Sequence, residues 1–416
     1  MKRKFILGAI AISVAGIMIA GIGILLHNEQ KKTELKEHKD LVDEVWQSVN
    51  REYIEPTVNN QDWQAVRNEY LSRSYTSSEE TYKAIQEMLE LLGDPQTQFL
   101  TPDQFEAITT DPFGIGIFLT QDEKTGELKV ITSLENSPAF AAGILPGDVI
   151  VKINGQSTQG VDLYEGYRRL QVPESNQQVI LTVRRRQKEL EFRLTIDKWE
   201  LKSVHYSYQS RPAGSIGYIR LSILSADGAK EMRKAIEDLE KKKVSGYILD
   251  LRSNPGGVLY AATEIAEIWL SEGIIVSTVD RQGQSDIRAN NRAFTDKPLV
   301  VLVDKGTGSA SEILAGALQD NQRAVLVGTR TLGNNRIQSV KKLKSEDGSG
   351  LSITIAKWQT AKGEDIYNLG LTPDVELEIA ETKQISLSKE GAWGTPADPQ
   401  YAKAQEILTG LIKKQN

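Results

Sequence analysis

The strongest constraint on the fold is a strand, turn and helix pattern from Val301 to Leu318, which reads VLVDKGTGSASEILAGAL. The apolar run predicts a buried strand, the glycines predict a turn, and the residues that follow have helical spacing. Ser309 and Ser311 fall at the start of the predicted helix, close to its unpaired N–H groups. Such groups can stabilise an oxyanion during acyl transfer, although on spacing alone an ordinary helix N-cap is the simpler interpretation.

Two further segments favour the catalytic interpretation of this pattern. The stretch from Tyr247 to Leu270 contains LRSNPGG between a predicted strand and a predicted helix, and VGTRTLGNNRIQSV runs from Val327 to Val340. In this order, LRxNPGG, SASEI and TxGxxxxQSV resemble the carboxy-terminal processing peptidases, which are serine proteases with a Ser–Lys dyad. The resemblance extends over about residues 40–380 without a large gap.

The resemblance implies a role for several residues of these segments. Ser309 corresponds to the nucleophile that attacks the scissile carbonyl. The backbone N–H groups of Ala310 and of Gly256 or Gly257 correspond to the oxyanion hole, where glycine allows the backbone to approach a substrate closely. Gln338 corresponds to the residue that orients the general-base lysine.

The lysine itself is missing from this chain. In the family it follows the glycine of a T-F-G-K-G segment, and the same position here is Asn334. A neutral amide does not accept a proton near pH 7, and the nearby Arg336 stays protonated. Three lysines are candidate replacements, although structural or solvent-facing roles are the simpler interpretation: Lys341, Lys342 and Lys357.

Two functions therefore follow from the sequence. The first is a membrane-anchored serine endopeptidase that cleaves proteins near their C-termini. The alternative is a catalytically impaired pseudoprotease that binds C-terminal tails as a scaffold or regulator. Loss of a general base typically slows an enzyme by about 10²- to 10⁴-fold, so Asn334 puts activity in doubt.

A second module is predicted at about residues 111–198, where short strands and turns replace the helical pattern. The stretch from Ser137 to Gln156, SPAFAAGILPGDVIVKINGQ, closely resembles a PDZ domain. In that fold a glycine-containing loop holds a peptide's terminal carboxylate through backbone N–H groups, and the peptide adds to the sheet as a strand. The corresponding loop residues are Phe113, Gly114, Ile115 and Gly116, for which a purely structural role is the alternative.

One position near the end of this module departs from the family. Gln171 stands where an arginine is usual, and in some relatives that arginine couples substrate docking to the active arrangement. Arg168 and Arg169 lie one helical turn earlier and are candidate substitutes, although both side chains facing water is the simpler interpretation.

The predicted fold is an α/β core, a mixed sheet with covering helices, with an inserted PDZ domain and an N-terminal helical region. In the helical region Leu41, Val45 and Val49 recur at helical spacing, and such a stripe serves either the region's own core or a homodimer. The predicted boundaries are 1–27 for a signal anchor, 28–39 for a linker, 40–110 for the helical region, 111–198 for the PDZ domain, 199–380 for the peptidase core and 381–416 for a tail without a recognisable motif.

The N-terminus carries a topology signal. Lys2, Arg3 and Lys4 precede an uncharged run from Phe5 to Leu26, which is long enough to cross a bilayer and ends in a poor cleavage site. We therefore predict an uncleaved, single-pass anchor with the body in the periplasm or an equivalent lumen.

Composition excludes several other classes of protein. The chain has no cysteine, so disulfides and thiol catalysis are excluded. Of its three histidines only His205 lies in a region predicted to fold, which argues against a Ser–His–Asp triad and a histidine-rich metal site. The net charge of −6 is made of interspersed signs, so nucleic acid is not a predicted partner, and neither a metal nor a cofactor is predicted.

Overall fold

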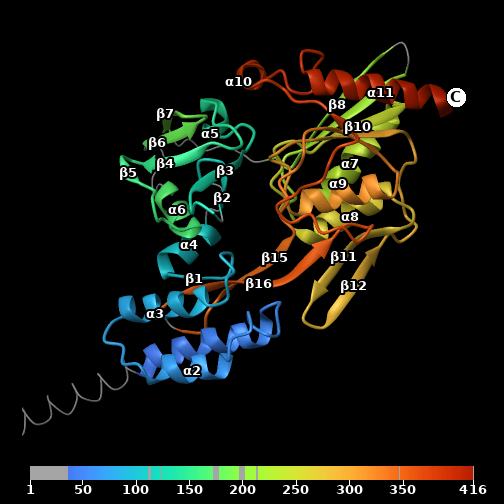
Figure 1. Ribbon diagram of the computed structural model, residues 1–416. Helices are drawn as coiled ribbons and strands as arrows, with labels where there is room; N and C mark the ends of the chain where they lie inside the picture. The colour runs from blue at the N-terminus through green and yellow to red at the C-terminus, as the bar shows by residue number, and fades with distance from the viewer. Residues whose placement is uncertain are drawn as a thin grey trace, which may run out of the picture. The chain divides into compact units, whose positions relative to one another are not determined.

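The computed structural model describes residues 36–110, 114–122, 124–171, 178–195, 202–211, 214–345 and 347–415 (Figure 1). The chain forms two compact units. The first comprises Met1–Pro102 with Gln338–Thr354, and the second comprises Asp103–Ile337 with Ile355–Asn416. The domain boundaries at residues 110, 198 and 380 stay predictions.

The first unit is built mainly from helices. A helix over residues 36–52 is followed by α2 (Trp63–Ser72), α3 (Ser78–Glu90) and the short strand β1 (Gln98–Leu100). Side chains cap two of these helices, because Asp62 accepts from the Ala65 N–H and Ser77 accepts from the Glu80 N–H. β1 pairs antiparallel with the first residues of β16 (Gly350–Gln359).

The apolar stripe predicted in this region is buried within the protomer. Leu41, Val45 and Val49 are each at most 5% exposed. The stripe thus contributes to the protein's own core, and dimerisation through these helices has no support.

The core of the second unit is a six-stranded sheet in the order β17-β14-β13-β10-β9-β8. All neighbouring strands are parallel except β8, which is antiparallel to β9. The strands are β8 (Val204–Gln209), β9 (Ile216–Leu221), β10 (Gly246–Asp250), β13 (Leu299–Val303), β14 (Val325–Gly328) and β17 (Val375–Glu376). β10 and β13 are buried along their whole length, which is typical of parallel strands covered on both faces.

Helices cover both faces of this sheet (Figure 1). One apolar cluster joins the sheet to α7, α8 and α9, and a second joins it to α11. The helices are α7 (Gly228–Lys241), α8 (Leu259–Trp269), α9 (Ala310–Asp320) and α11 (Pro399–Gln415). The C-terminal tail, which carried no recognisable motif, therefore supplies one face of the core.

The inserted module has its own sheet and its own apolar core. Its strand order is β2-β3-β4-β6-β7, with β5 beside β4, so β2 lies at the edge. The elements are β2 (Ile117–Gln121), β3 (Leu128–Ser133), α5 (Pro138–Ala142), β4 (Val149–Ile153), β5 (Gln156–Ser157), α6 (Leu163–Leu170), β6 (Gln178–Arg185) and β7 (Lys188–Thr195), preceded by α4 (Pro102–Thr110).

The remaining described elements complete a mixed α/β fold. β11 (Ile274–Asp280) pairs antiparallel with β12 (Gly283–Arg288) and with the last residues of β16. β15 (Arg336–Lys342) pairs with β16, and α10 (Glu381–Glu390) precedes α11. The predicted fold class, an α/β core with a PDZ domain, is confirmed.

The predicted single-pass membrane location needs correction. Crossing a bilayer takes about 20 consecutive apolar residues in one helix. Across the described ranges the structure contains no helix with that length and apolar character. The run from Phe5 to Leu26, on which the prediction depended, lies outside those ranges. The membrane location is therefore withdrawn.

Candidate functional site

Ser309 occupies a strained turn between a buried strand and a helix. β13 ends at Val303, α9 begins at Ala310, and Ser309 has φ 50° and ψ −122°. A positive φ is rare for a residue with a side chain and costs about 1–3 kcal/mol, so it persists only where surrounding contacts enforce it. Strain of this kind is concentrated at catalytic and binding sites.

The Asn-Pro-Gly-Gly turn lies directly against this strained residue. Gly256 has φ 104°, and a Cβ there would lie 2.8 Å from the Gly308 carbonyl oxygen and 3.0 Å from the Ala310 nitrogen. The Gly308 N–H donates to the Asn254 carbonyl at 2.9 Å. Glycine is therefore required at position 256 because two backbone segments meet there.

Two backbone N–H groups beside Ser309 are placed to bind an anion. The Gly256 N–H donates to the Asn254 side-chain oxygen at 3.0 Å, which removes it from consideration. The N–H groups of Ala310 and Gly257 have no acceptor among the described residues. Of the two glycines that the sequence left open, Gly257 is thus the better candidate. The Ser311 hydroxyl is buried without a partner in the same ranges, so it does not cap the helix.

Glu312, one turn into α9, joins the turn of Ser309 to the segment that contains Asn334. Its carboxylate is fully buried. Oxygen Oε2 accepts from the Ser309 N–H at 2.9 Å and from the Asn334 N–H at 3.0 Å. Oxygen Oε1 accepts from the Thr331 hydroxyl at 2.5 Å and from the Gly333 N–H at 2.6 Å. One carboxylate thus brings positions 309 and 334 together.

Burial raises the pKa of Glu312 to about 7, although the four donors oppose this shift. Sequence reasoning missed this residue. The signal was present, because a serine followed three residues later by glutamate at a helix start is the capping-box pattern.

Asn334 and Asn335 are held differently. Among the described residues, the Asn334 side-chain oxygen accepts from the Arg336 N–H alone, at 3.3 Å. The Asn335 side chain is 2% exposed and donates to the Trp358 carbonyl at 3.0 Å and to Asp365 at 2.8 Å. Position 334 therefore has one weak side-chain contact in the described part of the chain, whereas the side chain at position 335 is a structural anchor.

The candidate replacement lysines have partners of their own where the structure records them. Lys341 pairs with Glu52 at 2.6 Å within the first unit, and Lys357 lies 3.8 Å from Asp365 within the second. Gln338 belongs to the first unit, where its amide donates to Gln96 and Thr354, each at 2.8 Å. Its role in orienting a base stays a prediction.

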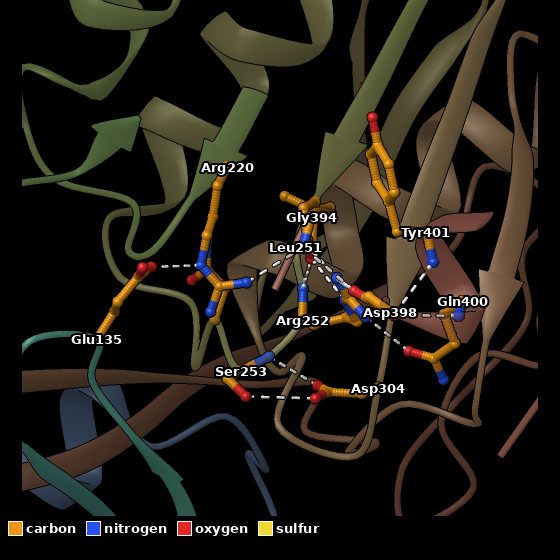
Figure 2. Close-up of polar contacts among 12 residues, drawn as sticks. Glu135, Arg220, Leu251, Arg252, Ser253, Asp304, Gly394, Asp398, Gln400 and Tyr401 are labelled. Carbon is orange, nitrogen blue, oxygen red and sulfur yellow. Dashed lines mark hydrogen bonds and ion pairs between the residues drawn. The ribbon is translucent and has the colours of Figure 1, made fainter. Parts of the chain in front are cut away.

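A buried ionic network holds the LRSNPGG strand end. Arg252 donates through Nη2 to Asp250 at 2.6 Å and to Asp398 at 2.7 Å, and through Nη1 to Gln400 at 3.0 Å. Figure 2 shows Arg252 directed toward Asp398 and Gln400. Burial alone would raise the pKa of Asp250, but the charges of Arg252 and Arg220 lower it to about 2. The tail residues just before and inside α11 therefore stabilise the strand that leads to Gly256.

The PDZ module contacts the same strand ends within the second unit. Glu135 accepts from Arg220 Nε at 2.5 Å, and Arg220 Nη1 lies 3.3 Å from Asp250 (Figure 2). The Thr132 hydroxyl donates to the Ser253 carbonyl at 3.0 Å. The module is thus joined to the segment that supplies the Asn-Pro-Gly-Gly turn.

The PDZ module contains a narrow apolar groove of about 230 Å³ between β2 and α6. Its lining includes Gly114, Ile115, Ile117, Tyr167 and Leu170. Gly114 and the neighbouring Gly116 have positive φ angles of 42° and 80°. Gly114 and Ile115 line this groove and Gly116 follows them directly, whereas Phe113 lies outside the described residues. Binding of a carboxylate by this loop stays a prediction.

Gln171, which departs from the family pattern, and the nearby arginines form contacts with neighbouring residues. The Gln171 amide donates to the Ala107 carbonyl of α4. Arg168 and Arg169 both pair with Glu165 on the same helix, at 2.6 Å and 2.7 Å. These arginines therefore bind a neighbouring glutamate, where the sequence suggested side chains simply facing water.

No cluster of three or more metal-binding side chains occurs in the described part of the chain.

Comparison with known proteins gives consistent results. Residues 215–377 match the sequence model of peptidase family S41, and residues 130–185 match that of the PDZ domain. A carboxyl-terminal-processing protease of Synechocystis sp. is 43% identical over 408 residues, which cover 96% of this chain and 93% of that protein. A carboxyl-terminal-processing protease of Picosynechococcus sp. is 38% identical over 380 residues, covering 90% of each.

A solved structure agrees with these matches. The photosystem II D1 C-terminal processing protease superposes with a TM-score of 0.78 at 32% identity, covering 88% of this chain and 99% of that one.

Proposed function

Because the chain belongs to the carboxyl-terminal-processing protease family, we propose that it is a serine endopeptidase that cleaves proteins near their C-termini, with Ser309 as the nucleophile. The strained conformation of Ser309 carries this proposal. A helix cap needs no positive φ, whereas an exposed nucleophile on a sharp strand-to-helix turn is typically strained.

The backbone around Ser309 supports an oxyanion hole. In the proposed reaction the Ser309 hydroxyl attacks the scissile carbonyl, whose oxygen becomes negatively charged. The N–H groups of Ala310 and Gly257 stabilise that charge, and neither has a competing acceptor among the described residues. Removing one such donor typically costs about 10²- to 10³-fold in rate.

Catalysis also requires a base that accepts the proton of the Ser309 hydroxyl. Asn334 cannot accept it, and both oxygens of Glu312 already accept two donors each. Glu312 is thus a positioning residue for the two segments and a poor base. We expect hydrolysis slower than with a lysine at position 334 by about 10²- to 10⁴-fold.

A second candidate function is a pseudoprotease that binds C-terminal tails without processing them. Asn334 favours it, as do the partners of Lys341 and Lys357 in ion pairs of their own. The two functions share substrate recognition and differ only in turnover.

Tail recognition is assigned in this proposal to the PDZ groove. Its apolar walls suit an apolar last residue, and the glycine loop suits a free carboxylate. We expect a peptide ending in an apolar residue with a free carboxylate to bind the full chain more tightly than its amidated form. Equal affinity in fluorescence anisotropy would exclude carboxylate capture.

Turnover is tested by restoring the base. The comparison uses one unstructured tail substrate with the wild type, Asn334→Lys, and Asn334→Lys combined with Ser309→Ala. We expect Asn334→Lys to raise the cleavage rate and Ser309→Ala to abolish the gain. Fast wild-type cleavage that Ser309→Ala stops would mean that another group is the base. No cleavage by any variant would favour the tail-binding function.

A further inference from the structure

The outer edge of β2 is the place where a tail would add to the PDZ sheet. Among the strands that the structure describes, β2 pairs with β3 alone, and its other side faces the groove and α6. An edge strand presents backbone N–H and C=O groups to which an extended peptide can hydrogen-bond. In a strand the backbone N–H and C=O groups of every second residue point to the same side. Ile117 and Leu119 are therefore the residues whose backbone groups a docked peptide would pair with.

The Tyr167 hydroxyl from α6 already occupies this edge at Leu119. It accepts from the Leu119 N–H at 2.8 Å and donates to the Leu119 carbonyl at 3.4 Å. Both backbone groups that a docked strand needs at Leu119 are therefore satisfied by one side chain. Burial raises the pKa of Tyr167 above its usual value, so the hydroxyl keeps its proton at physiological pH.

The position of this contact decides which part of a tail it affects. A carboxylate held near Gly114 and Gly116 places the last residue of an antiparallel tail beside Ile117. The third residue from the end then reaches Leu119, because paired residues on one edge alternate. The last residue can dock with Tyr167 in place, whereas the third-from-last residue cannot.

Resting on the proposed tail recognition, we propose that Tyr167 is an internal competitor that limits tail binding to the last residues until its hydroxyl is displaced from Leu119. Tyr167 thereby sets the affinity of tails that pair along β2. The ligand class is an extended peptide with a free carboxylate, an apolar last residue and an unblocked N–H at its third-from-last residue.

The test measures peptide affinity for the full chain and two variants. Tyr167→Phe removes the hydroxyl and keeps the ring. Tyr206→Phe is the matched control, because it removes a tyrosine hydroxyl that binds Asp238 at 2.9 Å on α7, outside the groove. The probes are a labelled ten-residue peptide, the same peptide N-methylated at its third-from-last residue, and a two-residue peptide with the same end.

We expect Tyr167→Phe to bind the ten-residue peptide about three- to tenfold more tightly than the wild type, the range for one net hydrogen bond. N-methylation should remove most of that gain and change wild-type affinity by less than about twofold, and Tyr206→Phe should match the wild type. The two-residue peptide should bind wild type and Tyr167→Phe equally.

Three outcomes would overturn the inference. Equal or weaker binding of the ten-residue peptide by Tyr167→Phe, beside clear wild-type binding, would refute the competitor role and leave tail recognition standing. A large loss of wild-type affinity when the third-from-last residue of the peptide is N-methylated would show that the Leu119 backbone is already accessible to tails. This measurement uses the wild-type protein alone. Absence of binding to every protein would remove the proposed tail recognition and this inference together.

Discussion

The two sides of the Ser309 site differ in what this chain retains. On the nucleophile side, the strained serine, the abutting Gly256 and the unpaired Gly257 N–H form a complete backbone arrangement. On the base side, the backbone at position 334 is in place, but its side chain cannot take a proton. Under the proposed function, buried hydrogen bonds thus hold the backbone at position 334 in place although the side chain there is not a base.

Each side also has its own anchor. The nucleophile side depends on the network of Arg252, Asp250 and Asp398, and the base side depends on Glu312. Substitutions in the two anchors therefore distinguish residues that stabilise the site from residues that take part in the proposed reaction.

The largest effect is expected in the anchor of the nucleophile side. Arg252→Met leaves the buried Asp398 without its cation and takes one of two neighbouring arginines from the buried Asp250, and breaking a buried pair this way costs about 3–5 kcal/mol. Urea unfolding measures this loss in the free energy of unfolding. Arg193→Met is the control, because Arg193 is 65% exposed and pairs only with Glu191, so a change within about 0.5 kcal/mol is expected. Similar losses in both variants would contradict the anchoring role of Arg252.

The anchor of the base side should make stability depend on pH. The pKa of Glu312 is raised from 4.5 to about 7, so the folded state holds the proton more tightly than the unfolded state. The stabilisation from the protonated Glu312 side chain is fully present below pH 4.5 and is lost as the pH rises through 7. The free energy of unfolding should change by roughly 3 kcal/mol over this range. Glu312→Gln should remove this dependence in urea unfolding between these pH values.

Glu378→Gln serves as the matched control for Glu312, because the Glu378 side chain is 74% exposed. It should keep the wild-type slope of stability against pH. A Glu312→Gln slope equal to that of the wild type would mean that Glu312 is already ionised throughout this range.

The smallest expected effect on stability concerns the two neighbouring asparagines. Asn335→Ala removes hydrogen bonds to the Trp358 carbonyl and to Asp365 in a buried place, at a cost of about 1–3 kcal/mol. Asn334→Ala removes one contact of 3.3 Å and should change stability by about 0.5 kcal/mol or less. Thermal unfolding of the two variants distinguishes them, and an equal loss would make position 334 structural as well.

The fold was accessible from the sequence, and Ser309 could be proposed as the nucleophile, because the signals for both are local. The strand, turn and helix around Ser309 are encoded by consecutive residues, and the glycine loop near Gly114 precedes the PDZ signature that begins at Ser137. The positive φ of Ser309 was not predictable, because contacts from Gly256 and Glu312 impose it.

The contacts that were missed join distant parts of the chain. Arg252 and Asp398 are 146 residues apart, and no periodic pattern marks such a pair. The tail therefore carried no recognisable signal, although it supplies two partners of Arg252. The Tyr167 contact to Leu119 spans 48 residues and depends on how α6 lies along β2.

The packing of α11 bears on self-processing. A tail that adds to a strand has to be extended. The last residues of this chain are helical through Gln415, with Tyr401, Leu408 and Ile412 buried against the sheet. Releasing them would expose apolar side chains that each contribute about 1.5–3 kcal/mol to stability. We therefore expect the protein not to cleave itself within α11, so that intact-mass measurement after long incubation of Asn334→Lys finds this helix uncut.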